Sequence, residues 1–247
     1  MLRRYYQYLW SNAENDNKNN IYRLLESHSG AVLLDCGCDT GEFTVEIARR
    51  VGTNVVYGID VVPKRYEQAM ARSIRVIEAD LNNPFPFEDN SVDVVHSNQV
   101  IEHILNLNSF ISEIHRVLKP GGYAIVSTEN LSSWHNIFAL LFGFQPFSLT
   151  NIAFGKTIGN PLTLHASDER FSGLSKYETY HHVRVLSYAG LRDLFPLYGL
   201  TVENILGAGY YPLPALTSRI LAKLDPRHCA FLTVKIRKIK KGDIPQK

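Results

Sequence analysis

Cysteine is scarce in this sequence, and no long apolar run interrupts it. The three cysteines, Cys36, Cys38 and Cys229, are too few and too unevenly spaced for a disulfide framework. They indicate reduced thiols, and a C-x-C pair without a second pair is a poor zinc signal. The longest apolar run, 137–144, is too short to span a bilayer, and the N-terminus has no signal-peptide pattern. We therefore expect a cytoplasmic protein without stable membrane insertion.

An excess of charge of one sign is also missing. The 247 residues include 26 Lys and Arg against 24 Asp and Glu, for a net charge of +2. This balance gives no reason to expect a nucleic-acid partner. The basic stretch 235–241 alternates with apolar residues, so we interpret it as the end of a half-exposed strand. A hydrophobic content of 45% indicates a globular chain with a substantial core.

Short β-branched runs alternate with helical patterns from residue 31 onward. Five runs, 31–35, 55–60, 74–79, 92–97 and 123–128, have the near-continuous apolar character of strands that are covered on both faces. Apolar residues at helical spacing predict a helix that begins near Gly41 and another over 107–118, which the Lys-Pro-Gly-Gly of 119–122 should stop. With closing strands over 201–206 and 231–236, the pattern predicts an α/β fold. Its doubly wound, mostly parallel, seven-stranded Rossmann-like sheet would carry helices on both faces.

Residues 131–182 break this alternation and are rich in aromatic residues, glycine and proline. We interpret them as an insertion after the fifth strand, serving as a substrate lid or as a second small core. The helical spacing of Trp134, Phe138 and Phe142 favours the core. The expected single domain thus has N-terminal cap helices (1–29), a cofactor-binding core (30–130), the insertion (131–182), and a closing helix and strands (183–247). An aromatic-rich rim favours a hydrophobic or aromatic small-molecule substrate.

A glycine loop, Asp35-Cys-Gly37-Cys-Asp39-Thr-Gly41, joins the first strand to the first core helix. Its G-x-x-x-G spacing differs from the dinucleotide fingerprint. The loop contains two carboxylates and no Lys or Arg, so a pyrophosphate would meet a repulsion of ~1–4 kcal/mol per close pair. A ligand with an ammonium or sulfonium end fits better. Asp60, at the end of the second strand, is placed to accept both hydroxyls of a ribose, or else to form a turn before Pro63.

Six motifs in order resemble those of class I S-adenosylmethionine-dependent methyltransferases, in the type 11 branch that includes ubiquinone and menaquinone biosynthesis. They occupy residues 34–41, 58–60, 78–80, 91–96, 101–103 and 116–122. One departure is Asp39, which stands where the family usually has its middle glycine. The resemblance covers residues 30–130 well.

The resemblance implies that S-adenosyl-L-methionine binds along the carboxyl ends of the strands. Asp35 would support the amino group, Asp60 the ribose and Asp80 the adenine amino group, while Asn98 and Gln99 would line the methyl-donor end. Asp80 as a turn cap stays an alternative, because Asn82-Asn-Pro84 follows it. The implied cofactor-binding residues are Asp35, Gly37, Cys38, Asp39, Thr40, Gly41, Asp60, Val61, Ala79, Asp80, Leu81, Asn98 and Gln99.

A general base is needed for methyl transfer only when the accepting atom keeps a proton. His103, just after the fourth strand, is our candidate, although Glu102 and His103 could instead brace their own helix. His181 and His182, at the end of the insertion, could also face the pocket, although surface or structural roles are favoured for them. Glu102 and His103 also resemble an E-x-x-E-H metal cluster of other methyltransferases. Gln99 replaces the first carboxylate there, so we expect no metal.

The sequence therefore predicts a methyltransferase that moves a methyl group to O, N or C of a small molecule and releases S-adenosyl-L-homocysteine. The alternatives are an RNA or protein methyltransferase, a non-catalytic cofactor-binding module and, least favoured, a nicotinamide-dependent oxidoreductase. The oligomeric state stays open.

Overall fold

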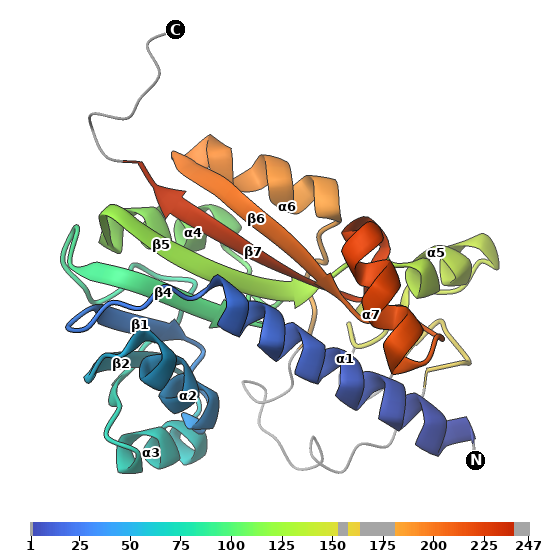
Figure 1. Cartoon of the computed structure of the whole chain (residues 1–247), viewed down its shortest axis with the longest axis horizontal. Helices are drawn as coiled ribbons and strands as arrows, with labels where there is room; N and C mark the ends of the chain where they lie inside the picture. Colours follow the sequence, from blue (N-terminus) through green and yellow to red (C-terminus); the bar gives the residue numbers. More distant parts are fainter. Residues whose placement is uncertain (1, 153–157, 164–180, 240–247) are drawn as a thin grey trace, which may run out of the picture.

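The computed structural model describes residues 2–152, 158–163 and 181–239 and contains a seven-stranded sheet in the order β3-β2-β1-β4-β5-β7-β6 (Figure 1). Strand β7 pairs antiparallel with β5 and β6, and the other pairs are parallel. The predicted fold class is confirmed. The strands are β1 (Val32–Cys36), β2 (Val55–Asp60), β3 (Arg75–Glu78), β4 (Val92–Asn98), β5 (Leu118–Glu129), β6 (Leu200–Ala208) and β7 (Phe231–Lys238).

Strand order reverses between β1 and β4, which lie side by side at the centre of the sheet. Residue Asp35 of β1 stands opposite Gly58 of β2 on one side and His96 of β4 on the other. Because parallel strands bring their carboxyl ends to one edge, the segments that follow β1, β2 and β4 meet there. A ligand site is expected at such a reversal.

Helices cover both faces of the sheet, as the apolar strand runs require. One core cluster packs α1, α2 and α3 against one face, and the other packs α4 and α6 against the opposite face. The helices are α1 (Leu2–Leu24), α2 (Glu42–Val51), α3 (Pro63–Ala71), α4 (Leu107–Val117), α5 (Trp134–Leu141), α6 (Tyr188–Leu194) and α7 (Ala215–Leu224). Within the described ranges, no helix is long and apolar enough to cross a bilayer.

The N-terminal segment differs from its prediction, because residues 2–24 form one long helix and not several. Its buried positions recur at helical spacing, but two of them are polar, Asn17 and Asn20, which hides the pattern in a hydropathy reading. The 107–118 helix also ends differently. Its cap is the extended residue Leu118, and the Lys-Pro-Gly-Gly turn lies inside β5.

The prediction of a half-exposed last strand was wrong. Thr233 and Lys235 of β7 are buried, because α1 and the segment after it cover this face. The Lys235 ammonium lies 2.6 Å from a Glu26 carboxylate oxygen, and the Arg237 guanidinium pairs with Glu203 and Glu26. Two cations of the basic stretch, Lys235 and Arg237, are thus neutralised by carboxylates of the same molecule, whereas Lys238 donates to backbone carbonyls of residues 115 and 118.

The described part of the insertion contains α5 and a short 3-10 turn, and residues 153–157 and 164–180 lie outside the described ranges. The core that Trp134, Phe138 and Phe142 were expected to form was not found. Their side chains are exposed, by 37%, 53% and 70% respectively. The buried positions of α5 are instead Asn136 and Ala139.

Candidate cofactor and active site

The glycine loop turns sharply between β1 and α2, and three of its residues have positive φ. These are Gly37 (79°), Asp39 (48°) and Gly41 (79°). A Cβ at Gly41 would lie 2.6 Å from Ile74 Cδ1 and 2.9 Å from Ala69 Cα, so glycine is required there both for conformation and for packing. Asp39, where the family has glycine, adopts the left-handed conformation that Asp tolerates better than most residues.

Asp60 ties this loop to the end of β2. One carboxylate oxygen accepts from the Asp39 backbone N–H at 2.9 Å, and the other accepts from the Val62 N–H at 2.9 Å. Burial raises the pKa of Asp60, and these backbone hydrogen bonds oppose the rise. A carboxylate has about four lone-pair positions, so two remain for a ligand. The turn-forming and ligand-binding interpretations of Asp60 are therefore compatible. The neighbouring Val61 is 38% exposed.

Asp35 lies beneath the loop and is 2% exposed. One of its oxygens accepts from the Thr44 hydroxyl at 2.5 Å, and the other lies 2.7 Å from His96 Nδ1. This network joins β1, α2 and β4 at the base of the loop. The geometry thus favours a positioning role for Asp35, and its direct contact with a ligand amino group stays a prediction.

A pocket of about 340 Å³ lies between the loop and α1. Its lining consists of residues 38–43, which include Cys38, Asp39, Thr40 and Gly41, together with Lys18, Tyr22 and Glu46. Cys38 is no nucleophile here, because burial and the nearby carboxylates raise the pKa of its thiol.

The loop is less negative than its sequence suggests. Arg65 of α3 lies 3.2 Å from the Asp39 carboxylate, and Lys18 of α1 lies 5.5 Å from the centre of the Phe43 ring at the pocket. Both cations belong to elements outside the loop, so the charges within the loop sequence alone do not indicate them.

The predicted adenine-binding residues follow β3, which ends at Glu78. Asp80 caps a turn, because one of its oxygens accepts from the Asn82 backbone N–H at 2.9 Å and from the Asn82 side chain at 2.8 Å. A direct contact of Asp80 with an adenine amino group stays a prediction. Ala79 is half-buried, and Leu81 is buried in the core.

Asn98 and Gln99 end β4 under the middle of α1. The Asn17 side chain donates to Asn98 Oδ1 at 3.1 Å, and Asn17 Oδ1 accepts from Ser127 and Thr233, both at 2.8 Å. Gln99 has a positive φ of 57°, and its backbone N–H donates to the Ser127 carbonyl. Sequence reasoning missed Asn17 and Lys18. The signal that could have found Asn17 is its helical register with the buried residues of α1.

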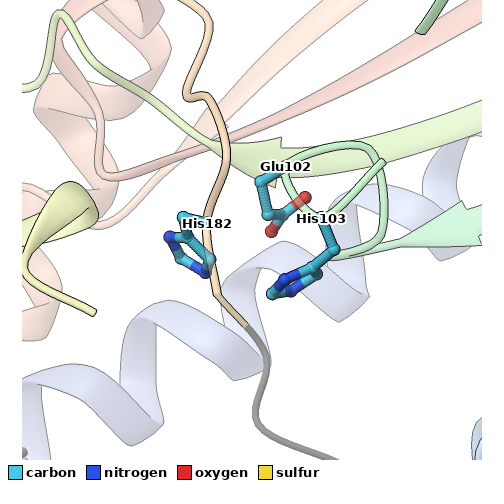
Figure 2. A group of neighbouring side chains, drawn as sticks. All are labelled: Glu102, His103 and His182. Carbon is cyan, nitrogen blue, oxygen red and sulfur yellow. The ribbon is translucent and has the colours of Figure 1, made fainter. Parts of the chain in front are cut away.

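His103, the candidate base, belongs to a cluster with Glu102 and His182. Figure 2 shows Glu102 and His103 on the turn after β4, facing His182 on the segment that leads to α6. The two imidazole rings lie edge to face, with centres 4.8 Å apart. Backbone carbonyls orient both rings: His103 Nδ1 lies 3.1 Å from the His181 carbonyl, and His182 Nδ1 lies 2.6 Å from the Ser148 carbonyl. In each ring, Nδ1 is therefore held by the backbone.

Burial shifts the acid–base properties of this cluster in opposite directions. It raises the pKa of Glu102 to about 7, and with the help of nearby His182 it lowers the pKa of His103 to about 4. Glu102 Oε2 accepts from the Thr128 hydroxyl at 2.9 Å, whereas the buried Oε1 has no hydrogen-bond partner among the described residues. A ligand that donates a hydrogen bond would satisfy this oxygen.

The same three side chains could hold a metal ion, because one ligand atom from each lies within 4.8 Å of the others. The expectation of no metal rested on Gln99 and did not include His182. It stays a prediction.

Comparison with known proteins finds methyltransferases. The methyltransferase domain family matches residues 34–126. A probable S-adenosylmethionine-dependent methyltransferase of Mycolicibacterium smegmatis is 31% identical over 210 residues, which are 83% of this chain and 63% of that protein. A 2-phytyl-1,4-naphtoquinone methyltransferase of Nostoc punctiforme is 36% identical over 107 residues, 40% of this chain and 46% of that protein. The chain thus spans less than two thirds of these relatives.

A solved S-adenosylmethionine-dependent methyltransferase from Mesorhizobium loti shares the fold, with a TM-score of 0.60 at 19% identity over 91% of this chain and 97% of that chain. The cofactor of this family is S-adenosylmethionine, and the coupling of the glycine loop to Asp60 fits that ligand. Residues 34–126 thus match the methyltransferase domain family, and the chain shares the fold of a solved S-adenosylmethionine-dependent methyltransferase.

Proposed function

We propose that this protein is an enzyme that transfers a methyl group from S-adenosylmethionine to O, N or C of a small, hydrophobic or aromatic molecule. One observation carries the proposal: Asp60, at the end of β2, is bonded to the glycine loop and keeps lone pairs for a ribose. When bound, S-adenosylmethionine supplies a methyl group on a sulfonium, which a nucleophile takes by direct displacement.

The residues of the chain would then mainly hold and align the ligands. In this proposal the loop and the pocket beneath α1 take the amino-acid end of the cofactor, with Lys18 facing its carboxylate. Asp60 takes the ribose, Asp80 the adenine, and Asn98 and Gln99 the methyl-donor end. Alignment of this kind accounts for up to ~7–11 kcal/mol of a barrier in intramolecular reactions.

The Glu102–His103–His182 cluster would receive a proton from an acceptor such as a hydroxyl. His103 is neutral at pH 7 because its pKa is about 4, and Glu102, with a pKa of about 7, lies near the ideal for proton exchange at that pH. A cytoplasmic location is part of the proposal, and its support is that all three cysteines are buried and unpaired.

Titration calorimetry with S-adenosylmethionine, S-adenosylhomocysteine and NAD tests the cofactor. We expect both sulfur compounds to bind and NAD to bind more weakly, and tighter NAD binding would defeat the proposal. Transfer of a labelled methyl group to a metabolite pool tests the reaction. Cofactor binding without any transfer would support a non-catalytic module instead.

A further inference from the structure

Three helices expose large apolar side chains at one end of the molecule, where Figure 1 shows α5, α7 and the N-terminal end of α1. Trp134, Phe138 and Leu141 of α5 and its C-cap Phe142 recur at helical spacing on one face, and Leu141 and Phe142 are 73% and 70% exposed. On α7, Leu216, Ile220 and Leu224 recur every fourth residue and are 72%, 53% and 76% exposed. Tyr5, Tyr6 and Tyr8 add an aromatic fringe on α1.

These helices are held together and form one surface, here called the apolar end. The Tyr5 hydroxyl donates to the Pro212 carbonyl at 3.0 Å, which joins α1 to the start of the α7 segment. The Trp134 ring of α5 stacks on His228, just beyond α7, with ring centres 4.5 Å apart. The Trp134 indole N–H also donates to the Tyr210 hydroxyl at 3.2 Å. Exposed apolar side chains that gather at one end of a molecule indicate an interaction site.

Charge distinguishes between possible partners. The segments that build the apolar end, residues 4–13, 131–152 and 212–224, contain Arg4, Arg219 and Lys223 but no Asp or Glu. Asp16 of α1 pairs with Arg219 at 2.9 Å, which leaves Arg4 and Lys223 as the cations of this end. In a chain with 24 acidic residues, this makes the end apolar, aromatic and cationic. A second copy docked here by two-fold symmetry would bring like charges together. An anionic lipid surface complements both the cations and the apolar side chains.

We propose that the apolar end docks on the surface of an anionic phospholipid bilayer. The side chains of α5 and α7 would enter the boundary between headgroups and acyl chains, with the tyrosines of α1 at headgroup level. This docking takes place at the membrane–water interface, so it does not require a helix that is long and apolar enough to span the bilayer. It stands independently of the catalytic proposal.

Vesicle flotation tests this inference, with phosphatidylcholine vesicles that contain or lack phosphatidylglycerol. We expect the full chain to float with the anionic vesicles and far less with the neutral ones. The triple variant Leu216→Ser, Ile220→Ser, Leu224→Ser should lower the partition coefficient about tenfold or more, because apolar burial is lost. Arg4→Gln with Lys223→Gln should lower it roughly fivefold per cation.

Leu197→Ser is the matched control, because Leu197 is 80% exposed but lies before β6, at the opposite end of that strand from α7. It should float like the wild type, and circular dichroism should show every variant folded. Equal loss in the control, or no preference for anionic vesicles, overturns the inference. A dimer that light scattering detects in the wild type and not in the triple variant also overturns the inference, because a second copy of the chain then covers the apolar end.

Discussion

Replacing Asp60 by asparagine separates the ligand role of this residue from its structural role. In the wild type, the two carboxylate oxygens of Asp60 accept from the backbone N–H groups of Asp39 and Val62. Asparagine keeps one acceptor oxygen but turns its amide N–H₂ toward one of these donors. The loss of a loop hydrogen bond costs about 1 kcal/mol, and removing a carboxylate that burial disfavours offsets this cost. We therefore expect the melting temperature to move little.

The ligand affinity should respond much more strongly. Hydrogen bonds from ribose hydroxyls to a carboxylate are charge-assisted and contribute about 1.5–3 kcal/mol. The Kd of S-adenosylhomocysteine should therefore rise about 10- to 100-fold by titration calorimetry. 5′-Methylthioadenosine keeps the ribose and lacks the amino-acid end, so its affinity should fall by the same factor. Asp89→Asn is the surface control. A Kd within about twofold of wild type, in a folded variant, would remove Asp60 from the site.

Three further predictions concern residues around the same site. Lys18→Gln should weaken S-adenosylhomocysteine about three- to tenfold and leave 5′-methylthioadenosine unchanged, and calorimetry showing equal losses would refute its contact with the carboxylate. Asn17→Ala should lower the free energy of unfolding in urea by about 2–4 kcal/mol, because the buried hydroxyls of Ser127 and Thr233 and the half-buried Asn98 lose their partner. Asn12→Ala, which removes one bond to a backbone carbonyl within the same helix, should cost under about 1 kcal/mol. Glu102 and His103 should give opposite pH dependences. The pKa of Glu102 is raised from 4.5 to about 7, so its contribution is full below pH 4.5 and is lost as pH rises through 7. The pKa of His103 is lowered from 6.5 to about 4, so its contribution is full above pH 6.5 and is lost as pH falls through 4. The difference in free energy of unfolding between wild type and Glu102→Gln, and the same difference for His103→Gln, should be measured in urea across this pH range. The two differences should change with pH in opposite directions, and equal slopes would contradict the pKa shifts.

The strands and helices of residues 30–130 could be predicted from the sequence because their signals are local. A buried parallel strand is a short apolar run, and α2 and α4 bury one stripe each. The turn-forming role of Asp60 could also be predicted, since its bond to the Val62 N–H depends only on the end of one strand and the turn beside it. In these cases the information lies within a few residues of the feature that it predicts.

The rest of the site depends on contacts between residues far apart in the chain. Nothing near His103 indicates that His182 faces it, and the Asp39–Arg65 pair needs α3 to return beside the loop. The exposure of α5 could not be predicted for a related reason. Helical spacing identifies an apolar face, but whether another element covers that face depends on tertiary structure.

Helix α1 connects the two proposals, because it is continuous from the tyrosines of the apolar end to Lys18 at the cofactor pocket. The rise of about 1.5 Å per residue separates Tyr6 from Lys18 by about 18 Å along the axis. Buried hydrogen bonds from Asn17 and Asn20 to the sheet fix the helix at its pocket end. A bilayer that holds the apolar end would therefore also set the distance and orientation of the cofactor pocket. A methyl acceptor anchored in that bilayer would need a headgroup that extends about 18 Å from the membrane surface, the distance from Tyr6 to Lys18. A methyl acceptor that lies entirely within the bilayer would have to leave the membrane before methylation.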